Sequence, residues 1–432
     1  MPNRNPAFAA AALSGSGTPP SVRAMDKIDT GDTAWLLIST ALVMLMTPAL
    51  GFFYGGLVGK KNVLSTLTHS FFILCLISVQ WVLWGYSLAF SPDTGAGLIG
   101  GLGWVALKGV GFAPNADYAA TVPHQAFMAF QMMFAVITPA LITGAFAERI
   151  SFKAYVIFAL AWATLVYDPL AHWVWGTGGW LHVLGALDFA GGTVVHISSG
   201  VSALVAAVLI GRRLKTGGPH DATMTILGAS LLWFGWFGFN AGSALAAGGG
   251  LATSAFVVTN TAAAMAGLTW LTASWIHKGR PSVLGMAAGA VAGLVAITPA
   301  SGFVDVSGSI IIGLGAGVIC YGAMQLRPRL KIDDALDVWA VHGIGGTWGA
   351  LATGLFATVA INSAGQDGLF YGNPQQLLAQ AIAVGATWLY AAVVTAVIVK
   401  LIDVTIGFRV KEHEESLGLD ASQHGEIAYG LD

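Results

Sequence analysis

Two histidines within apolar sequence are the residues best suited to chemistry. His196 follows Thr-Val-Val, His342 follows Trp-Ala-Val, and an aspartate, Asp188 or Asp334, lies eight residues before each of them. A neutral imidazole can donate a hydrogen bond through one ring nitrogen and accept one through the other, so two imidazoles can share one proton. Such a pair would suit a small solute that both donates and accepts hydrogen bonds. The alternative is two unrelated structural histidines.

Three aspartates lie at the start of apolar segments. Asp188 precedes the run that contains His196, where its carboxylate could cap a helix, attract a cation, or do both. The residues alone slightly favour helix orientation over direct contact with a solute. Asp334 and Asp337 precede the run that contains His342, and there helix capping is the favoured interpretation.

Aromatic side chains gather in a pattern that predicts a cation-binding vestibule. Phe130 and Phe134 are one helical turn apart, and Trp175 ends a neighbouring apolar run. Aromatic faces bind a small desolvated cation by about 2 kcal/mol or more, although tryptophans also anchor helices at membrane surfaces. Ser243 could add a hydroxyl acceptor to this vestibule. The further aromatic candidates are Trp236 and Phe239.

The composition indicates a membrane protein. Of the 432 residues, 56% are hydrophobic and only 9% are charged, whereas soluble domains carry about 25% charged residues. A soluble protein of this size could not cover its surface with so few charges. The net charge of −2 gives no reason to expect nucleic-acid binding.

The cysteines and the lack of catalytic motifs argue against an enzyme. Cys75 and Cys320 both lie in apolar runs, which favours small buried side chains over a disulfide or a metal site. No metal-ligand cluster, nucleotide-binding loop or catalytic-triad pattern stands out in the sequence. The sequence therefore predicts neither an enzymatic activity nor a cofactor.

Apolar runs of about 20 residues recur along the chain and predict transmembrane helices. The sequence thus predicts an all-α polytopic protein with eleven spans. Their approximate limits are 33–57, 64–90, 124–147, 152–175, 191–211, 223–246, 252–276, 283–300, 306–325, 337–360 and 376–402.

Positive charge predicts the orientation of these spans. Alternate loops from the one after the first run, together with the C-terminal end, hold 15 of the 19 Lys and Arg residues. Because cytoplasmic loops are enriched in these residues, we expect the N-terminus outside and the C-terminus in the cytoplasm. That arrangement needs an odd number of spans, which agrees with eleven.

Recurring fragments predict an inverted repeat. Ile137-Thr138-Pro139-Ala140 recurs as Ile297-Thr298-Pro299-Ala300, Gly51–Gly56 is similar to Gly238–Ser243, and the aspartate–histidine spacing also recurs. The matches pair each span with the fifth span after it, so the second half would be upside down relative to the first. In such proteins the substrate path lies between the repeats.

The predicted organisation has three parts. Residues 1–30 form an N-terminal leader, either a weak signal sequence or, as we favour, a disordered segment with the functional start near Met25. Residues 31–402 form the eleven-helix domain, with repeats at about 33–211 and 223–360 and one extra helix outside them. Residues 403–432 form a cytoplasmic tail.

Several long strings resemble the Amt/Mep/Rh ammonium transporters, and the Amt branch more than the Rh branch. The resemblance extends from about residue 30 to the C-terminus. The strings that carry it are Asp188 to His196, Trp236 to Ser243, Asp337 to Gly343, Gly144 to Arg149 and Gly407 to Val410.

The resemblance implies a homotrimer in a plasma membrane, such as a bacterial inner membrane, with one pore in each protomer. It implies ammonium, ammonia and methylammonium as substrates, and a PII-type signal protein as a possible partner at the cytoplasmic face. The implied recruitment site comprises Phe134, Trp175 and Ser243 with Trp236 and Phe130 nearby. Phe134 and Phe239 match the family's gate, while Asp188, His196, His342, Tyr167 and Thr298 match pore positions. Asp334, Asp337 and Gly407 fall on structural or regulatory positions.

The expected mechanism is recruitment of ammonium, deprotonation near Asp188, and passage of ammonia past His196 and His342. The sequence leaves open whether net charge moves. A gas channel for ammonia or carbon dioxide is the first alternative, and the pairing of Trp175 with Ser243 argues against it. An ammonium sensor with little flux is the second, although the sequence has no recognisable signalling domain after its tail.

Overall fold

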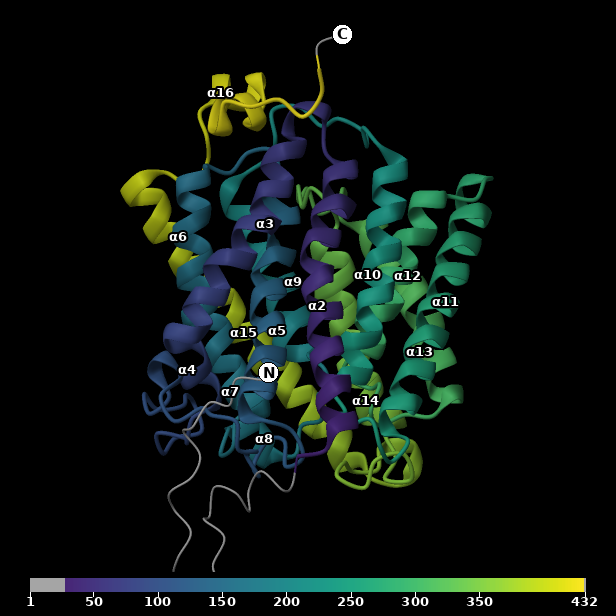
Figure 1. Ribbon diagram of the computed structural model, residues 1–432. Coiled ribbons are helices and arrows are strands. Elements are labelled where there is room, and N and C mark those ends of the chain that lie inside the picture. Colours follow the sequence, from purple (N-terminus) through teal and green to yellow (C-terminus); the bar gives the residue numbers. More distant parts are fainter. Residues whose placement is uncertain (1–27, 431–432) are drawn as a thin grey trace, which may run out of the picture.

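The computed structural model describes residues 28–430, and this part of the chain is helical. It contains no β-strand, only three isolated bridges in its loops. The predicted leader, residues 1–30, lies almost entirely outside the described residues. Figure 1 shows the long helices running side by side between two sets of loops, with the C-terminal segment at one end.

The N-terminal half contains five helical stretches, of which two are divided by a wider π-type turn and one begins with such a turn. The label η marks these turns and also short 3-10 segments. The five stretches are α2 (Thr30–Leu57); α3, η2 and α4 (Val63–Gln80, Trp81–Gly85, Tyr86–Phe90); α5 (His124–Phe146); α6, η4 and α7 (Phe152–Trp162, Ala163–Tyr167, Asp168–Trp175); and η5 with α9 (Gly192–Ile197, Ser198–Ile210). Short helical segments in the connections are η1 (Lys60–Asn62), η3 (Val105–Leu107) and α8 (Trp180–Leu184).

The C-terminal half has longer uninterrupted helices, with one π-type turn in the stretch that contains His342. They are α10 (Ala222–Gly242), α11 (Leu251–Lys278), α12 (Val283–Ile297), α13 (Val306–Leu326), η6 with α14 (Trp339–Ile344, Gly345–Phe356), η7 (Leu369–Tyr371) and α15 (Pro374–Ile406). The tail forms α16 (Glu412–Leu417) and η8 (Asp420–His424).

Several of these helices begin where a polar side chain can accept a hydrogen bond from the first turn. Asp29, Asp221, Ser282 and Asp305 each accept from a backbone N–H three residues later, at the starts of α2, α10, α12 and α13. The apolar sequence that follows each cap then forms the helix, because a lipid environment forces the backbone to satisfy its own hydrogen bonds.

Each predicted apolar run overlaps one of these helical stretches. Within the described residues, nine helices are long and apolar enough to cross a membrane, and Val283–Ile297 is a shorter apolar helix. Large apolar side chains such as Phe71, Ile276 and Val404 are more than half exposed on the outer faces of their helices. The chain is therefore a multi-pass membrane protein of about nine to eleven apolar helices. The count of eleven crossings stays a prediction.

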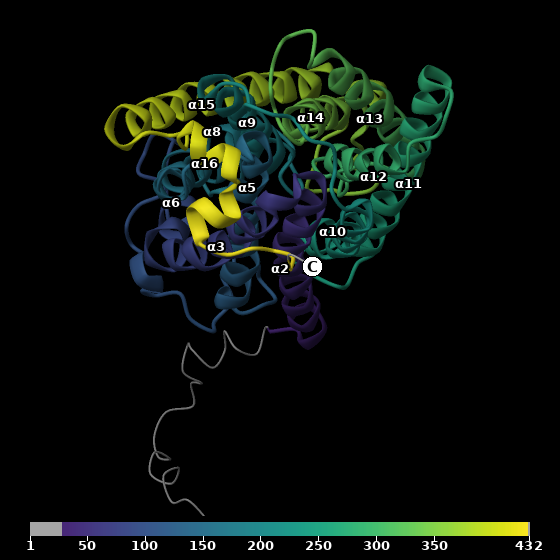
Figure 2. The ribbon, with the colours of Figure 1, turned by 90° about the horizontal axis from the view of Figure 1, so that it is seen from above.

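The two halves lie side by side and α15 joins them. Viewed along the helices, α3 to α9 occupy one side and α10 to α14 the other, and α15 runs along the periphery (Figure 2). It packs against α6, α9 and α14, and so contacts both halves. The central contacts are α2 against α10 and α9 against η6.

The C-terminal tail begins later than predicted and is folded. The helix α15 continues to Ile406 and ends at Gly407, whose φ of +79° favours glycine. The tail then packs on the loops at one end of the molecule (Figure 1). Leu419 N donates to Asn62 Oδ1 at 2.8 Å, and Ser65 N donates to Asp420 Oδ1 at 2.8 Å.

Candidate functional site

Three cavities follow one another through the middle of the protein. We name them by the predicted orientation: the outer cavity, of about 430 Å³, is lined by Phe134, and the narrow cavity, of about 10 Å³, by Phe239, His196 and His342. The inner cavity, of about 590 Å³, is again lined by His342. Phe134 and Phe239 are in direct contact with each other. A chain of aromatic and imidazole rings therefore connects the two wide cavities.

The outer cavity is an aromatic vestibule with a few acceptor oxygens. Trp175 and Phe134 meet edge to face, with ring centroids 6.1 Å apart. Ser243 Oγ donates to the Phe239 carbonyl at 2.8 Å, which leaves the lone pairs of the hydroxyl oxygen free to accept. The predicted recruitment residues Phe134, Trp175 and Ser243 thus line one cavity.

Gln131 belongs to this vestibule although the sequence reasoning did not select it. Its side chain lines the outer cavity, and its Oε1 has no hydrogen-bond partner among residues 28–430. A buried carbonyl oxygen without a partner is costly, so a donor that enters the cavity would be stabilised there. The signal in the sequence was an amide between Phe130 and Phe134 in an otherwise apolar stretch.

The stacked phenyl rings of Phe134 and Phe239 close the vestibule. Their centroids are 4.2 Å apart with an interplanar angle of 28°, and both side chains are at most 1% exposed. Phe130 packs edge to face on Phe134 at 5.0 Å and so supports this gate from behind. The stacked rings therefore separate the vestibule from the narrow cavity.

The two histidines meet directly below the gate. Nδ1 of His342 and Nδ1 of His196 are 3.2 Å apart, and both residues are at most 4% exposed. One nitrogen must carry the proton and the other must accept it, because two neutral rings share this contact. Nε2 of His196 has no partner among the described residues. The pair therefore keeps hydrogen-bonding capacity for a solute.

Two glycines allow the histidine-bearing segments to approach so closely. A Cβ on Gly200 would lie only 2.0 Å from the backbone N of Gly343, and a Cβ on Gly346 would lie 3.0 Å from the Cβ of His196. Gly200 and Gly346 each follow a histidine by four residues. The backbones of α9 and η6 thus cross at glycine, which fixes the separation of the imidazoles.

Asp188 orients the segment that contains His196. Its carboxylate accepts hydrogen bonds from the backbone N–H of Gly191, Gly192, Thr193 and Val194 at 2.6 to 3.3 Å, and from the Thr193 hydroxyl. All of its acceptor capacity is therefore directed at the start of η5. The Asp188 carbonyl accepts from Trp175 Nε1 at 2.9 Å, so the same residue also positions the vestibule wall.

Trp236 and Thr298 lie beside the histidines rather than in the vestibule. Trp236 stacks on His196 with centroids 5.5 Å apart and lines the narrow cavity, and its Nε1 donates to Thr298 Oγ1 at 2.9 Å. Trp236 is three residues before Phe239 on α10, which directs it one turn further in. Asn240, which the sequence reasoning did not select, accepts from Thr298 Oγ1 at 3.3 Å and completes this buried network.

Tyr167 does not line any of the three cavities. Its ring packs on Trp81 with centroids 6.0 Å apart, and its hydroxyl is buried without a partner among the described residues. The reason is its place at the end of η4, which directs the side chain toward the helix that contains Trp81. The structure therefore places the Tyr167 side chain behind the lining of the path rather than in it.

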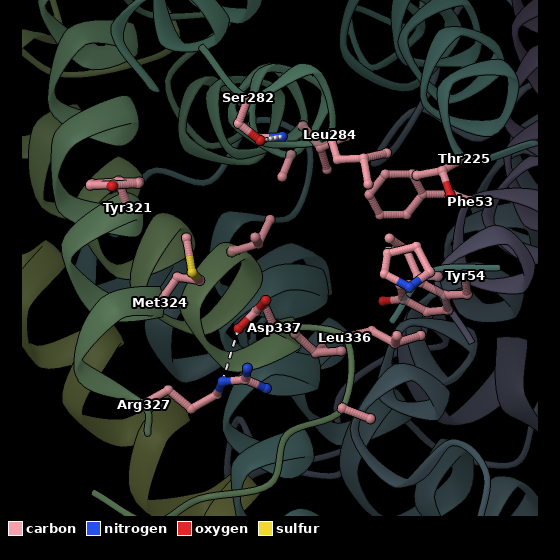
Figure 3. Close-up of a pocket in the computed structure, with 18 of the residues that line it drawn as sticks. Phe53, Tyr54, Thr225, Ser282, Leu284, Tyr321, Met324, Arg327, Leu336 and Asp337 are labelled. Atoms are coloured by element: carbon pink, nitrogen blue, oxygen red, sulfur yellow. Dashed lines mark hydrogen bonds and ion pairs between the residues drawn. The ribbon is translucent and has the colours of Figure 1, made fainter. Parts of the chain in front are cut away.

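The inner cavity differs from the vestibule because charged groups line it. Figure 3 shows Asp337 and Arg327 at its wall, where Arg327 Nε and Asp337 Oδ1 are 3.0 Å apart. Burial raises the pKa of the Asp337 carboxyl to about 7, with Arg327 opposing and Asp334 adding to the rise. Asp337 also has a φ of +60°, a strained value for an aspartate just before η6.

Asp334 caps the second histidine segment as Asp188 caps the first. Asp334 Oδ2 accepts from the backbone N–H of Trp339 at 2.7 Å, at the start of η6. The next acid back along the chain, Asp333, forms an ion pair with Arg213 at 2.7 Å. Burial alone would raise the pKa of Asp333, but the hydrogen bonds from Arg213 outweigh it and lower the pKa to about 2.

The comparison with known families decides which class of protein this is. A sequence profile described as the Ammonium Transporter Family matches residues 34–429. The chain belongs to the ammonium transporter family. It is 55% identical over 403 residues to an ammonium transporter of Bacillus subtilis, covering 92% of this chain and 98% of the relative.

Solved structures of family members have the same fold. Saccharomyces cerevisiae Mep2 is similar with a TM-score of 0.88 and 36% identity, covering 95% of this chain and 93% of Mep2. A structure described as "Sensor Amt Protein" has a TM-score of 0.84 and 28% identity, covering 94% of this chain and all of that chain. Membership in this family supports ammonium transport across a membrane, and the family consists of transporters rather than enzymes.

Proposed function

We propose that the chain takes up ammonium through the three aligned cavities and delivers ammonia past the two histidines into the cytoplasm. The cation is recruited between Trp175, Phe134 and Ser243, loses its proton near Asp188, and passes the phenyl gate as a neutral molecule. The observation that carries this proposal is the continuity of the three cavities, because Phe134, Phe239 and His342 connect each cavity with the next.

The energetics favour deprotonation over passage of the ion. Taking an isolated ion into an apolar medium costs on the order of tens of kcal/mol. Removing a proton at pH 7 costs about 4.6 kcal/mol when the lysine pKa of about 10.4 stands in for that of ammonium. The neutral route therefore has the lower barrier, and potassium, which has no proton to lose, is excluded.

The narrow cavity suits ammonia because it offers both hydrogen-bonding roles. In the imidazole pair one ring donates a hydrogen bond and the other accepts it, and the surrounding side chains are apolar or aromatic. Asp188 contributes in this proposal through its negative field and its hold on η5, since its oxygens are occupied by backbone donors. Current measurements decide whether the released proton accompanies the substrate.

The proposed assembly and orientation follow the resemblance and the loop charges. We propose a homotrimer in a plasma membrane, with the N-terminus and vestibule outside and the tail in the cytoplasm. The inverted repeat of residues 33–211 and 223–360 agrees with the matching caps of η5 and η6 by Asp188 and Asp334. A PII-type protein would dock on the tail side, and cross-linking in membranes tests the trimer.

Uptake of labelled methylammonium into proteoliposomes tests the proposal. We expect saturable uptake that potassium does not inhibit and that Trp175→Leu weakens. Current recorded in parallel shows whether charge accompanies the substrate. No uptake by correctly folded protein would contradict the proposal and favour a sensor, the role named for one of the similar structures.

A further inference from the structure

A buried acid and a buried amide face each other where two interrupted helices meet, outside the three cavities. Gln80 is the last residue of α3 and Asp168 is the first residue of α7. Gln80 Nε2 donates to Asp168 Oδ2 at 2.8 Å, and both residues are at most 1% exposed. A π-type turn follows Gln80 and another precedes Asp168, so both helices depart from regular geometry at this contact.

One atom on each partner is left over. Within residues 28–430, Asp168 Oδ1 and Gln80 Oε1 have no hydrogen-bond partner, and Asp168 forms no ion pair. Each residue of the pair therefore has one acceptor oxygen that receives no hydrogen bond. A single proton on the carboxyl would turn one of these oxygens, Asp168 Oδ1, into a donor, and Gln80 Oε1 is an acceptor without a partner on the same pair.

Asp188 shows what a buried carboxylate ion requires in this protein. It accepts from four backbone N–H groups and one hydroxyl, whereas Asp168 accepts from a single amide. An unpaired carboxylate inside a membrane protein is costly, and neutralisation by a proton is the usual escape. The contrast in donors therefore points to a neutral acid at residue 168.

We infer that Asp168 is a proton-binding site within the membrane-spanning part, and that the neutral acid–amide pair with Gln80 positions α7. Gly85 makes room for the pair, because a Cβ there would lie 2.7 Å from both Gln80 side-chain heteroatoms. The helix α7 ends at Trp175, two turns on, so the pair also positions a wall of the vestibule. The functional part of this inference rests on the proposed role of Trp175.

The groups around the pair leave Asp168 as the residue that titrates. Thr164 Oγ1 accepts from Trp84 Nε1 at 3.0 Å and from Gln80 Nε2 at 3.3 Å, and neither Thr164 nor Trp84 ionises. No other titratable side chain among the described residues forms a hydrogen bond with Asp168. The elements packed against α7 carry four other titratable side chains, and α7 itself carries His172. The four are Tyr86 on α4, Tyr167 on η4, His182 on α8 and His196 on η5.

Thermal unfolding at a series of pH values tests the proton site without any transport assay. A folded state that holds a proton which the unfolded state has lost becomes less stable as pH rises, by about tenfold in the unfolding equilibrium per pH unit. We therefore expect the unfolding temperature of the wild type to decrease, relative to that of Asp168→Asn, as the pH is raised from about 6 to about 8. Parallel curves for the two proteins would overturn the inference.

An exchanged pair provides the matched control. Gln80→Glu combined with Asp168→Asn restores one acid and one amide in opposite places, so we expect the pH dependence to return. Infrared spectra should show a protonated carboxyl band that Asp168→Asn removes. A double variant that folds but stays independent of pH, or an unchanged infrared band, would contradict the acid–amide pair.

Methylammonium uptake tests the positioning role. Asp168→Asn keeps a neutral pair at every pH. Its half-saturating methylammonium concentration should therefore equal that of the wild type at about pH 6, and it should rise less than the wild-type concentration as the pH approaches about 8. Substrate speciation is the same for both proteins and cancels in the ratio. If the ratio of the two half-saturating concentrations stays constant with pH while the unfolding temperatures differ as expected, that result would overturn the positioning of α7. It would leave the proton site and the transport proposal standing.

Discussion

The outer and inner ends of the central path are built on the same plan and lined by different chemistry. At each end an aspartate eight residues before a histidine accepts hydrogen bonds from the start of a π-type segment. The outer cavity is aromatic, with Phe134 and Trp175 in contact. The inner cavity instead has the ion pair of Asp337 and Arg327 at its wall.

In the proposed function, this difference separates capture of the cation from its release. An aromatic vestibule with oxygen acceptors stabilises a cation that has lost its water. Charges of both signs line the inner wall, including Arg327 and Asp337, and offer no such preference; in the proposed function they suit release into water. The repeated plan positions the two histidine segments, whereas the linings of the two ends differ.

The two capping aspartates should differ most in their effect on stability. Asp188→Ala leaves four backbone N–H groups near η5 without their acceptor, at about 1 to 3 kcal/mol each. We therefore expect the free energy of unfolding to fall by at least about 4 kcal/mol, and uptake to be lost. Asp334→Ala frees the Trp339 N–H and should cost about 1 to 3 kcal/mol. Unfolding midpoints in detergent check this, and equal losses would show that the ends are not specialised.

The aromatic lining should matter only at the outer end. Trp175→Leu removes a cation–π contact of about 2 kcal/mol, so we expect half-saturation of methylammonium uptake to rise about 30-fold. Tyr321→Leu in the inner cavity should leave half-saturation unchanged. Trp173→Leu is the matched control, because Trp173 packs on Tyr390 outside the vestibule. An equal rise for Tyr321→Leu would contradict the contrast between the two linings.

The smallest effect should be the pH dependence of the inner wall. Because burial raises the pKa of Asp337 from 3.8 to about 7, the folded protein holds a proton that the unfolded chain has lost within this range. Stability should therefore fall as pH rises through it, modestly because the side chain is 30% exposed. Asp337→Asn should flatten this slope in thermal unfolding, and an unchanged slope would place the titration elsewhere.

The sequence predicted the helices well because lipid makes apolar length decisive. The predicted runs 124–147 and 306–325 agree with α5 and α13 within a residue. The π-type turns were not predictable, since they depend on contacts between helices. For example, the turn that follows Gln80 ends at Gly85, and the Gln80 side chain packs closely against this glycine.

The site was predictable where one residue has one role. His196 and His342 stand out as ionisable groups in apolar runs, and the structure brings them together. Asp168 also lies in an apolar run, 152–175, but the sequence reasoning did not select it. Only tertiary structure reveals that its partner is Gln80, 88 residues away.

Potassium exclusion by the histidine pair is the central claim, and one measurement tests it most directly. Proteoliposomes that contain His342→Ala are compared with wild type for methylammonium uptake and for potassium flux. Loss of the contact between His342 and His196 removes the donor–acceptor pair that favours a neutral solute, so we expect potassium to enter the variant and not the wild type. A folded His342→Ala protein that still excludes potassium as the wild type does would contradict the account.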